Sequence, residues 1–200
     1  MGLIIYGSPR SRTMRVLWAA AELGLSYEHV PLEWDDPALK SPEFLRINPA
    51  GAIPAIVDDD FALAESLAIN LHLARKHGAG SLWPEAFDAQ SEILRWTVWA
   101  QGHLEPWVQQ DALLEDLRAA VKSHAWVPTH RALGLLETRL KDRDWLVGEA
   151  FTVADLNVAG VLSPSRAARL DLDAYPTLRD WLARCYGRPA AIETRARYAA

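Results

Sequence analysis

The segment INPAGAIPAIVDDD, residues 47–60, decides how the first part of the chain folds. Pro54 stands at the entrance of an apolar run that otherwise has the pattern of a buried strand. Proline cannot donate a hydrogen bond to a sheet ladder, so it is confined to strand ends, edges and bulges. Its peptide bond with Ile53 can also be cis, an arrangement that proteins retain for a purpose. We therefore expect Pro54 either to end a loop or to present the backbone of Ile53 to a ligand.

Strand and helix patterns alternate around this segment. Short β-rich runs occupy residues 3–6, 27–34, 53–59 and 61–64, and helical spacing of apolar residues covers 14–24, 42–48 and 65–78. The resulting order, βαβαββα, combines a crossover unit with a hairpin. It predicts an α/β domain in which helices cover a mixed four-stranded sheet.

The strand pattern ends near residue 80. Residues 81–87 have the composition of a linker, which divides the chain into an α/β domain at 1–80 and an all-helical domain at 88–200. Helices are expected at about 88–120, 124–142, 152–168 and 176–187.

In AFTVADLNVAGVL, residues 150–162, Thr152 and Asp155 have the spacing of a capping box. Arg195, Arg197 and the final RYAA predict a solvated tail.

The composition of the 200 residues excludes several classes of protein. A formal net charge of −5 gives no electrostatic reason to expect nucleic acid or an anionic membrane as a partner. The apolar runs are too short to cross a bilayer, and no signal peptide is visible. Cys185 is the only cysteine, which fits a reducing compartment, so we expect a cytoplasmic protein. The six histidines lack metal-ligand spacing, so no metal site is expected.

The turn YGSPRSRTMRV, residues 6–16, leads from the first strand into the first helix. Ser8 and Ser11 have the spacing of a redox C-x-x-C motif but carry no sulfur, so they cannot exchange disulfides. A serine hydroxyl at a helix start can instead donate a hydrogen bond to a thiolate supplied by a ligand, aided by the helix dipole. The alternative is that both serines only cap the helix.

A second helix start, AESLAI at residues 64–69, has the same character. Ser66 can bind a carboxylate through its N–H and hydroxyl, and Glu65 can bind an ammonium group. Together they match the headgroup of an amino acid. The alternative is that the acidic first turn only interacts favourably with the helix dipole.

Aromatic residues and one histidine recur at helical intervals in the helical region: Trp96, Trp99, His103 and Trp107. They can line an apolar pocket, or they can belong to a helix core or a subunit interface.

Taken together, four segments resemble the cytosolic glutathione transferases over nearly the whole chain. SPRSRTMRVLWAAAELGLSYE is similar to the family's first turn and helix, and LKSPEFLRINPAGAIPAI to the segment leading to its cis-proline. ESLAI is similar to its glutamyl-binding helix start, and GEAFTVADL to the capping motif of its helical domain. The resemblance implies a thioredoxin-like first domain, an all-α second domain and glutathione as co-substrate.

The resemblance also implies roles for individual residues. Ser11 would donate its hydroxyl to the glutathione thiolate as the catalytic residue of a serine-type site, and Lys40 would hold the glycyl carboxylate. Ile53, before the cis-proline Pro54, would bond the cysteinyl backbone. The γ-glutamyl end would be held by Glu65 and Ser66, and a pocket for a hydrophobic electrophile would include Pro9, Trp99 and Trp107. A homodimer is implied as well.

Three positions depart from the family pattern. Leu39 stands where some serine-type relatives have histidine, and Ala52 stands where glutamine or lysine is common, which weakens the expected hold on the glycyl end. Ser8 aligns with the cysteine of cysteine-type classes, so it is an alternative to Ser11. The leading hypothesis is conjugation of glutathione to small hydrophobic electrophiles. The alternatives are another glutathione-dependent reaction, such as peroxide reduction, dehalogenation or isomerisation, and a non-catalytic binding or structural module.

Overall fold

The computed structural model describes residues 2–108, 129–170 and 172–199, which group into two compact units. The first unit comprises residues 1–83 together with 188–200, and the second comprises residues 84–187. The expected division placed all of 88–200 in the helical domain. The difference lies at the C-terminal end, where residues 188–200 pack with the α/β unit.

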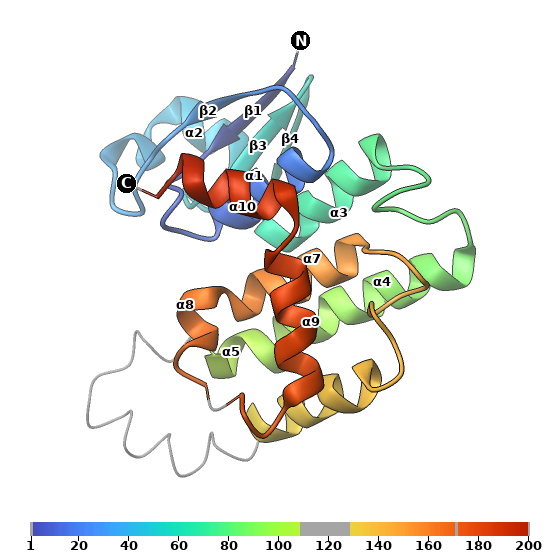
Figure 1. Ribbon diagram of the computed structural model, residues 1–200. Helices are drawn as coiled ribbons and strands as arrows, with labels where there is room; N and C mark the ends of the chain where they lie inside the picture. The colour runs from blue at the N-terminus through green and yellow to red at the C-terminus, as the bar shows by residue number, and fades with distance from the viewer. Residues whose placement is uncertain (1, 109–128, 171, 200) are drawn as a thin grey trace. The chain divides into compact units, whose positions relative to one another are not determined.

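The first unit is built on a four-stranded mixed sheet with the strand order β2-β1-β3-β4 (Figure 1). β1 (Leu3–Tyr6) pairs in parallel with β2 (Tyr27–Val30) and antiparallel with β3 (Ala55–Asp58), which pairs antiparallel with β4 (Phe61–Ala64). The helices are α1 (Thr13–Glu22), α2 (Pro42–Ile47) and α3 (Ser66–His77), with a 3-10 turn, η1 (Pro37–Lys40), before α2. The predicted βαβαββα order is confirmed.

Side-chain alternation along the strands divides the core of this unit into two faces. Ile5 and Ile56 are paired across β1 and β3 and fully buried, whereas Tyr6 and Ala55 form the next pair and point to the opposite face. The Tyr6 and Ala55 face packs in one cluster with Phe44 of α2. Since α1 and α3 pack against each other and also contact β1 and β3, we assign them to the other face.

The last helix, α10 (Pro189–Arg197), corrects the expectation of a tail without regular structure, although Arg195 and Arg197 are exposed as expected. Arg188, just before the helix, makes two hydrogen bonds of 2.8 Å to the carboxylate of Glu22 at the end of α1. The Glu22 side chain is only 4% exposed, whereas that of Arg188 is 32% exposed, so the carboxylate side of the ion pair is shielded from water. This contact anchors the start of the helix to α1 across 166 residues of sequence, which a local sequence pattern does not reveal.

The second unit is helical in all the parts that the structure describes. It contains α4 (Phe87–Trp99), the π-helical turn η2 (Ala100–Leu104), α5 (Glu105–Val108), a helix over 129–140, α7 (Val153–Leu162), α8 (Pro164–Ala167) and α9 (Pro176–Tyr186). The expected helix ends at 109–120 and 124–128 lie outside the described residues. None of the helices in the described ranges is long and apolar enough to cross a membrane.

Two prolines explain where this unit departs from the expected helices. Pro106 has no N–H for a regular helical bond, and the wider π turn directly precedes its helix. Residues 152–168 were expected to form one helix, which was wrong. The helix is interrupted at Ser163, whose backbone is not helical (φ −3°, ψ 149°) and which precedes Pro164. The ring of a proline disfavours the helical conformation of the residue before it.

The expected capping box at the start of α7 is confirmed. The carboxylate of Asp155 accepts a hydrogen bond from the backbone N–H of Thr152 at 3.0 Å, and both halves of the box are present. The same carboxylate accepts from the backbone N–H of Leu146 at 2.8 Å and from the indole N–H of Trp181 at 2.9 Å. Asp155 therefore joins α7, α9 and the preceding loop.

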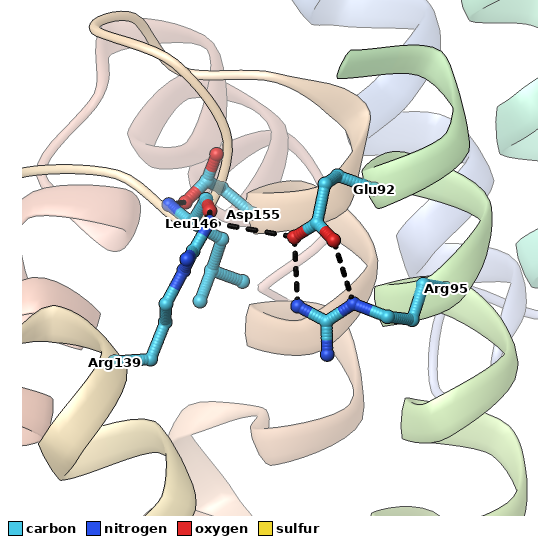
Figure 2. A network of polar contacts seen from close by, with 5 residues as sticks. All are labelled: Glu92, Arg95, Arg139, Leu146 and Asp155. Carbon is cyan, nitrogen blue, oxygen red and sulfur yellow. Dashed lines mark hydrogen bonds and ion pairs between the residues drawn. The ribbon is translucent and has the colours of Figure 1, made fainter. Parts of the chain in front are cut away.

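A polar network extends this junction to α4 (Figure 2). Arg139 donates to the carbonyl of Leu146 at 2.8 Å and to Glu92 at 3.4 Å, and Glu92 also binds Arg95 through two hydrogen bonds of 2.9 and 2.7 Å. The hydrogen bonds from Arg95 hold the pKa of Glu92 below its ordinary value. The network links α4, the helix over 129–140 and the loop at Leu146 through polar side chains.

A carboxylate at the end of β3 predicts how acid affects the first unit. Asp58 is buried, which opposes its ionisation, but hydrogen bonds from Lys76, His72 and His77 outweigh burial and hold its pKa below the ordinary value. The ionised carboxylate of Asp58 therefore stabilises the folded state. This stabilisation is fully present above the unfolded-state pKa of Asp58 and is lost as pH falls through its lower, folded-state pKa. Between about pH 5 and pH 3, we expect the urea midpoint of the wild type to fall more than that of Asp58→Asn.

The control is Asp59→Asn, because the exposed carboxylate of Asp59 binds only Lys76 within this cluster. We expect its acid dependence to match that of the wild type. An Asp58→Asn protein with the full wild-type loss of stability would refute the assignment.

Candidate functional site

The turn between β1 and α1 packs closely against Thr13 and Ile53 at Gly7. Its φ of +129° is a conformation that residues with side chains rarely adopt. A Cβ atom at this position would lie 2.2 Å from the hydroxyl oxygen of Thr13 and 2.9 Å from the Cβ of Ile53. Gly7 thus allows the end of β1, the start of α1 and the residue before Pro54 to meet.

The hydroxyl of Ser11 lies at the start of α1, as expected. Its O–H donates to the backbone carbonyl of Ser8 at 2.7 Å, and its oxygen accepts from the backbone N–H of Thr13 at 3.1 Å. It also shares a hydrogen bond of 2.8 Å with the Thr13 hydroxyl. Ser11 is half-buried, whereas Thr13 is fully buried. The sequence interpretation missed Thr13, whose only local signal is a hydroxyl residue at the helix start.

Ser8 has a different environment. Its side chain is buried, and its hydroxyl donates to a carboxylate oxygen of Glu33 at 2.9 Å. The hydroxyl oxygen of Ser8 also accepts from the backbone N–H of Arg10 at 3.3 Å. The proton of Ser8 is thus committed to an anionic acceptor inside the protein. The Ser11 proton is bonded to a neutral carbonyl and its residue is half-buried, whereas Ser8 is buried and its proton is bonded to a carboxylate; this favours Ser11 as a donor to an outside group.

The loop before β3 has the conformation that its sequence suggested. The bond between Ile53 and Pro54 is cis, which confirms that expectation. Buried Asn48 shapes the loop: its amide donates to the carbonyl of Ala52 at 2.7 Å, and its carbonyl oxygen accepts from the N–H of Ala50 at 3.1 Å. The sequence interpretation missed Asn48, although an Asn-Pro pair is a typical turn signal.

The side chain of Lys40, at the end of η1, reaches this loop. Its ammonium donates to the carbonyl of Gly51 at 3.2 Å and the residue remains exposed. Its neighbour Leu39 points the other way and is buried in the cluster with Phe44, where a charged or polar side chain would lose its hydration. A cation therefore lies beside the cis-proline loop, while the exposed Ala52 adds no polar side chain there.

The start of α3 brings Glu65 and Ser66 next to an arginine of α1. The hydroxyl of Ser66 accepts a hydrogen bond of 3.2 Å from the guanidinium of Arg15, and both residues are buried. Arg15 is 51 residues from Ser66 in sequence, so sequence reasoning missed it. The result is a helix N-terminus with a hydroxyl, a nearby guanidinium and the exposed carboxylate of Glu65. Such a set can hold the carboxylate and ammonium of one amino-acid headgroup.

The backbone of Glu65 is strained. Its φ of +71° with ψ of 107° is unfavourable for any residue with a side chain, and such strain costs about 1–3 kcal/mol. We predict that Glu65→Gly is more stable than Glu65→Ala by about 1 kcal/mol, because only glycine relieves the strain. Urea unfolding of the two variants measures the difference.

The control pair is Arg75→Gly and Arg75→Ala, in an exposed part of α3. There we expect the ordinary order, with the glycine variant less stable by about 1 kcal/mol. The same order at both positions would show that Glu65 carries no strain.

The residues expected to line an electrophile pocket fall in different units. Pro9 is half-buried in the first unit. Trp99 and Trp107 belong to the second, where both are half-buried and Trp99 meets the buried Trp96 edge to face at 5.2 Å. Their common pocket remains a prediction.

No group of three or more histidine, cysteine, aspartate or glutamate residues that could hold a metal ion occurs in the part of the chain that the structure describes.

Comparisons with known proteins point to one family. A family model described as "Glutathione S-transferase, N-terminal domain" matches residues 1–75, and one described as "Glutathione S-transferase, C-terminal domain" matches residues 109–189. Glutathione S-transferase 3 of Zea mays is 34% identical over 207 residues, covering 96% of this chain and 92% of the relative. Disulfide-bond oxidoreductase YfcG of Escherichia coli (strain K12) is 30% identical over 198 residues, covering 93% and 91%.

Among solved structures, Ure2p in complex with S-hexylglutathione matches with a TM-score of 0.86 at 25% identity, covering 96% of this chain and 97% of that one. The likeness extends over both units. It agrees with the thioredoxin-like α/β unit and the helical unit described above.

Proposed function

The chain belongs to the glutathione S-transferase family, and from this premise we propose that it conjugates the thiolate of glutathione to small hydrophobic electrophiles. The observation that carries the proposal is the meeting at Gly7 of the Ser11 turn with Ile53 of the cis-proline loop. A cysteinyl group bound along the backbone of Ile53 would have its sulfur near the start of α1. There a hydroxyl and the helix dipole favour a negative charge.

Ser11 is the proposed catalytic residue. A neutral donor bonded to a charged group contributes about 1.5–3 kcal/mol, and lowering a thiol pKa by two units requires about 2.7 kcal/mol. One hydrogen bond from Ser11, together with the helix dipole, is therefore enough to produce thiolate near neutral pH. The thiolate sulfur then forms a bond to the electrophilic carbon, and the leaving group departs with the electron pair of the broken bond.

The two ends of glutathione have separate proposed partners. Ser66 and the N-terminus of α3 would bind the γ-glutamyl carboxylate, with the guanidinium of Arg15 close to the same hydroxyl. Glu65 would bind the γ-glutamyl ammonium group. Lys40, beside the loop at Gly51, would bind the glycyl carboxylate.

Removing the hydroxyl of Ser66 tests the binding part of the proposal. We predict that Ser66→Ala weakens glutathione binding roughly tenfold, because the carboxylate loses a donor and Arg15 loses a partner. Isothermal titration calorimetry measures the dissociation constants.

The matched control is Ser81→Ala, since the Ser81 hydroxyl only donates to the carbonyl of Gly78 at the end of α3. Its affinity should equal that of the wild type. If Ser66→Ala binds glutathione as tightly as the control, the γ-glutamyl end lies elsewhere.

A second candidate function is reduction of disulfides by glutathione, which the likeness to disulfide-bond oxidoreductase YfcG favours. Cys185 is the only cysteine, and it is buried in α9 of the second unit. The sulfur at the Ser11 turn would therefore come from glutathione itself, whose thiolate attacks one sulfur of the substrate disulfide and releases the other as a thiolate. Turnover of a small disulfide that survives in Cys185→Ala would support this function.

The proposal also includes a cytoplasmic homodimer. Each unit exposes apolar side chains that a second copy would cover: Phe61 on β4 in the first unit, and a stripe of Phe87, Leu94 and Val98 along α4 in the second. Light scattering after size exclusion measures the mass in solution. A mass near twice 22.3 kDa is expected.

A further inference from the structure

β2 contacts the two peptide groups that flank Gly7, that with Tyr6 and that with Ser8. The N–H of Gly7 donates to the carbonyl of Val30 at 2.9 Å, and its carbonyl oxygen lies 2.8 Å from Nε2 of His29. Because a backbone carbonyl can only accept, Nε2 of His29 must carry the proton of this hydrogen bond. Val30 therefore holds the peptide group between Tyr6 and Gly7, and His29 holds the next one, between Gly7 and Ser8, at the start of the turn that carries Ser11.

The peptide group between Gly7 and Ser8 directly precedes the carbonyl to which the hydroxyl of Ser11 is bonded. The carbonyl of Gly7 and the N–H of Ser8 belong to one rigid plane. The next carbonyl, that of Ser8, accepts the hydroxyl of Ser11 at 2.7 Å and its N–H at 3.0 Å. The conformational freedom of Gly7 would let the plane rotate if His29 did not hold it.

The ring of His29 is itself held by the last helix. Tyr198, at the C-terminal end of α10, meets it edge to face, with ring centroids 5.2 Å apart at 82°. The Tyr198 hydroxyl lies 3.3 Å from that of Tyr27, and burial raises the pKa of Tyr27 to about 12, so Tyr27 is neutral at physiological pH. At the other end of α10, Arg188 is bound to Glu22. Both ends of the helix are thus tied to this unit.

We propose that His29 is a positioning residue for the Ser11 turn and that Tyr198 of the last helix keeps the His29 ring in place. This proposal rests on the function proposed above. Neither residue needs to touch glutathione: His29 acts through the carbonyl of Gly7, and Tyr198 acts through His29. The final helix of the chain therefore contributes to the geometry of the thiolate site, although it follows the whole helical unit in sequence.

The experiment compares wild type, His29→Ala and His29→Gln by two readouts. The first is the pKa of bound glutathione, from the ultraviolet absorbance of its thiolate, and the second is kcat/KM with a chromogenic electrophile. In His29→Ala we expect a raised thiol pKa and a roughly tenfold lower kcat/KM, with the dissociation constant of glutathione changed little. His29→Gln should restore both values toward wild type, because its amide can donate to the Gly7 carbonyl.

A second pair of variants tests the helix and does not require His29 to be replaced. Tyr198→Ala removes the ring beside His29 and should raise the thiol pKa, whereas Tyr198→Phe keeps the ring and should leave it unchanged. This pair also decides the question if His29→Ala fails to fold.

The outcomes separate the two proposals. Suppose that wild type lowers the thiol pKa of bound glutathione and that His29→Ala and Tyr198→Ala each lower it by as much as wild type does. The positioning role is then overturned, and the proposed function stands. If wild type binds glutathione without lowering its thiol pKa, the proposed function fails, and the positioning role fails with it.

Discussion

Ser11→Ala is expected to lower kcat/KM for conjugation roughly ten- to a hundredfold. The variant removes a hydrogen bond to a charged sulfur, worth about 1.5–3 kcal/mol, and leaves the rest of the glutathione site in place. The glutathione dissociation constant should change little, because Ser66, Glu65 and Lys40 still hold the two ends. Initial rates at varied pH with a chromogenic electrophile measure the effect, which should be largest below the thiol pKa of free glutathione.

Two variants serve as controls for this prediction. Ser11→Thr keeps a hydroxyl and should retain most of the activity. Ser8→Ala removes a buried hydroxyl bonded to Glu33 and should change the rate much less than Ser11→Ala. If Ser8→Ala abolishes activity and Ser11→Ala does not, the thiolate lies nearer Ser8.

Asp155→Ala is expected to lower the free energy of unfolding by about 3 kcal/mol or more. Burial raises the pKa of this carboxyl, while four hydrogen bonds from its neighbours favour the ionised form. The substitution removes the acceptor of three buried N–H groups, those of Leu146, Thr152 and the Trp181 indole, and of the Thr152 hydroxyl. Each buried, unsatisfied donor costs about 1–3 kcal/mol, and the losses are not fully additive.

Urea unfolding followed by circular dichroism measures this loss. Asp155→Asn is the matched variant: its amide oxygen can still accept, so it should fall between wild type and Asp155→Ala. Glutathione affinity of the folded fraction should be unchanged in both. A midpoint of Asp155→Ala within error of wild type would show that the junction in Figure 2 does not stabilise the second unit.

Local sequence signals were sufficient for most of the fold. Turn residues separated the strands and helices of the first unit, and Thr152 with Asp155 marked the start of α7. The break at Ser163 was missed even though Pro164, directly after the apolar run that ends at Leu162, was a local warning. The helix α10 was missed although Pro189 is a local start signal, and its anchoring through Arg188 to Glu22, 166 residues away in sequence, could not be read from a local pattern.

The same limit applies to the candidate site. Ser11, Pro54 and Glu65 each stand at a local boundary of an element, so the sequence pointed to them directly. Arg15 and His29 read as ordinary positions of a helix and a strand. They gain a role only because the fold brings Arg15 to Ser66 and His29 to Gly7. No spacing rule could have paired them.

The most direct test of the proposed chemistry is a pH titration of bound glutathione, followed by thiolate absorbance, in wild type, Ser11→Ala and Ser8→Ala. We predict that wild type and Ser8→Ala lower the thiol pKa by about two units and that Ser11→Ala restores it toward the value of free glutathione. Glutathione that binds to wild type with an unshifted thiol pKa, or does not bind at all, would contradict a thiolate-activating transferase and favour a non-catalytic use of this fold.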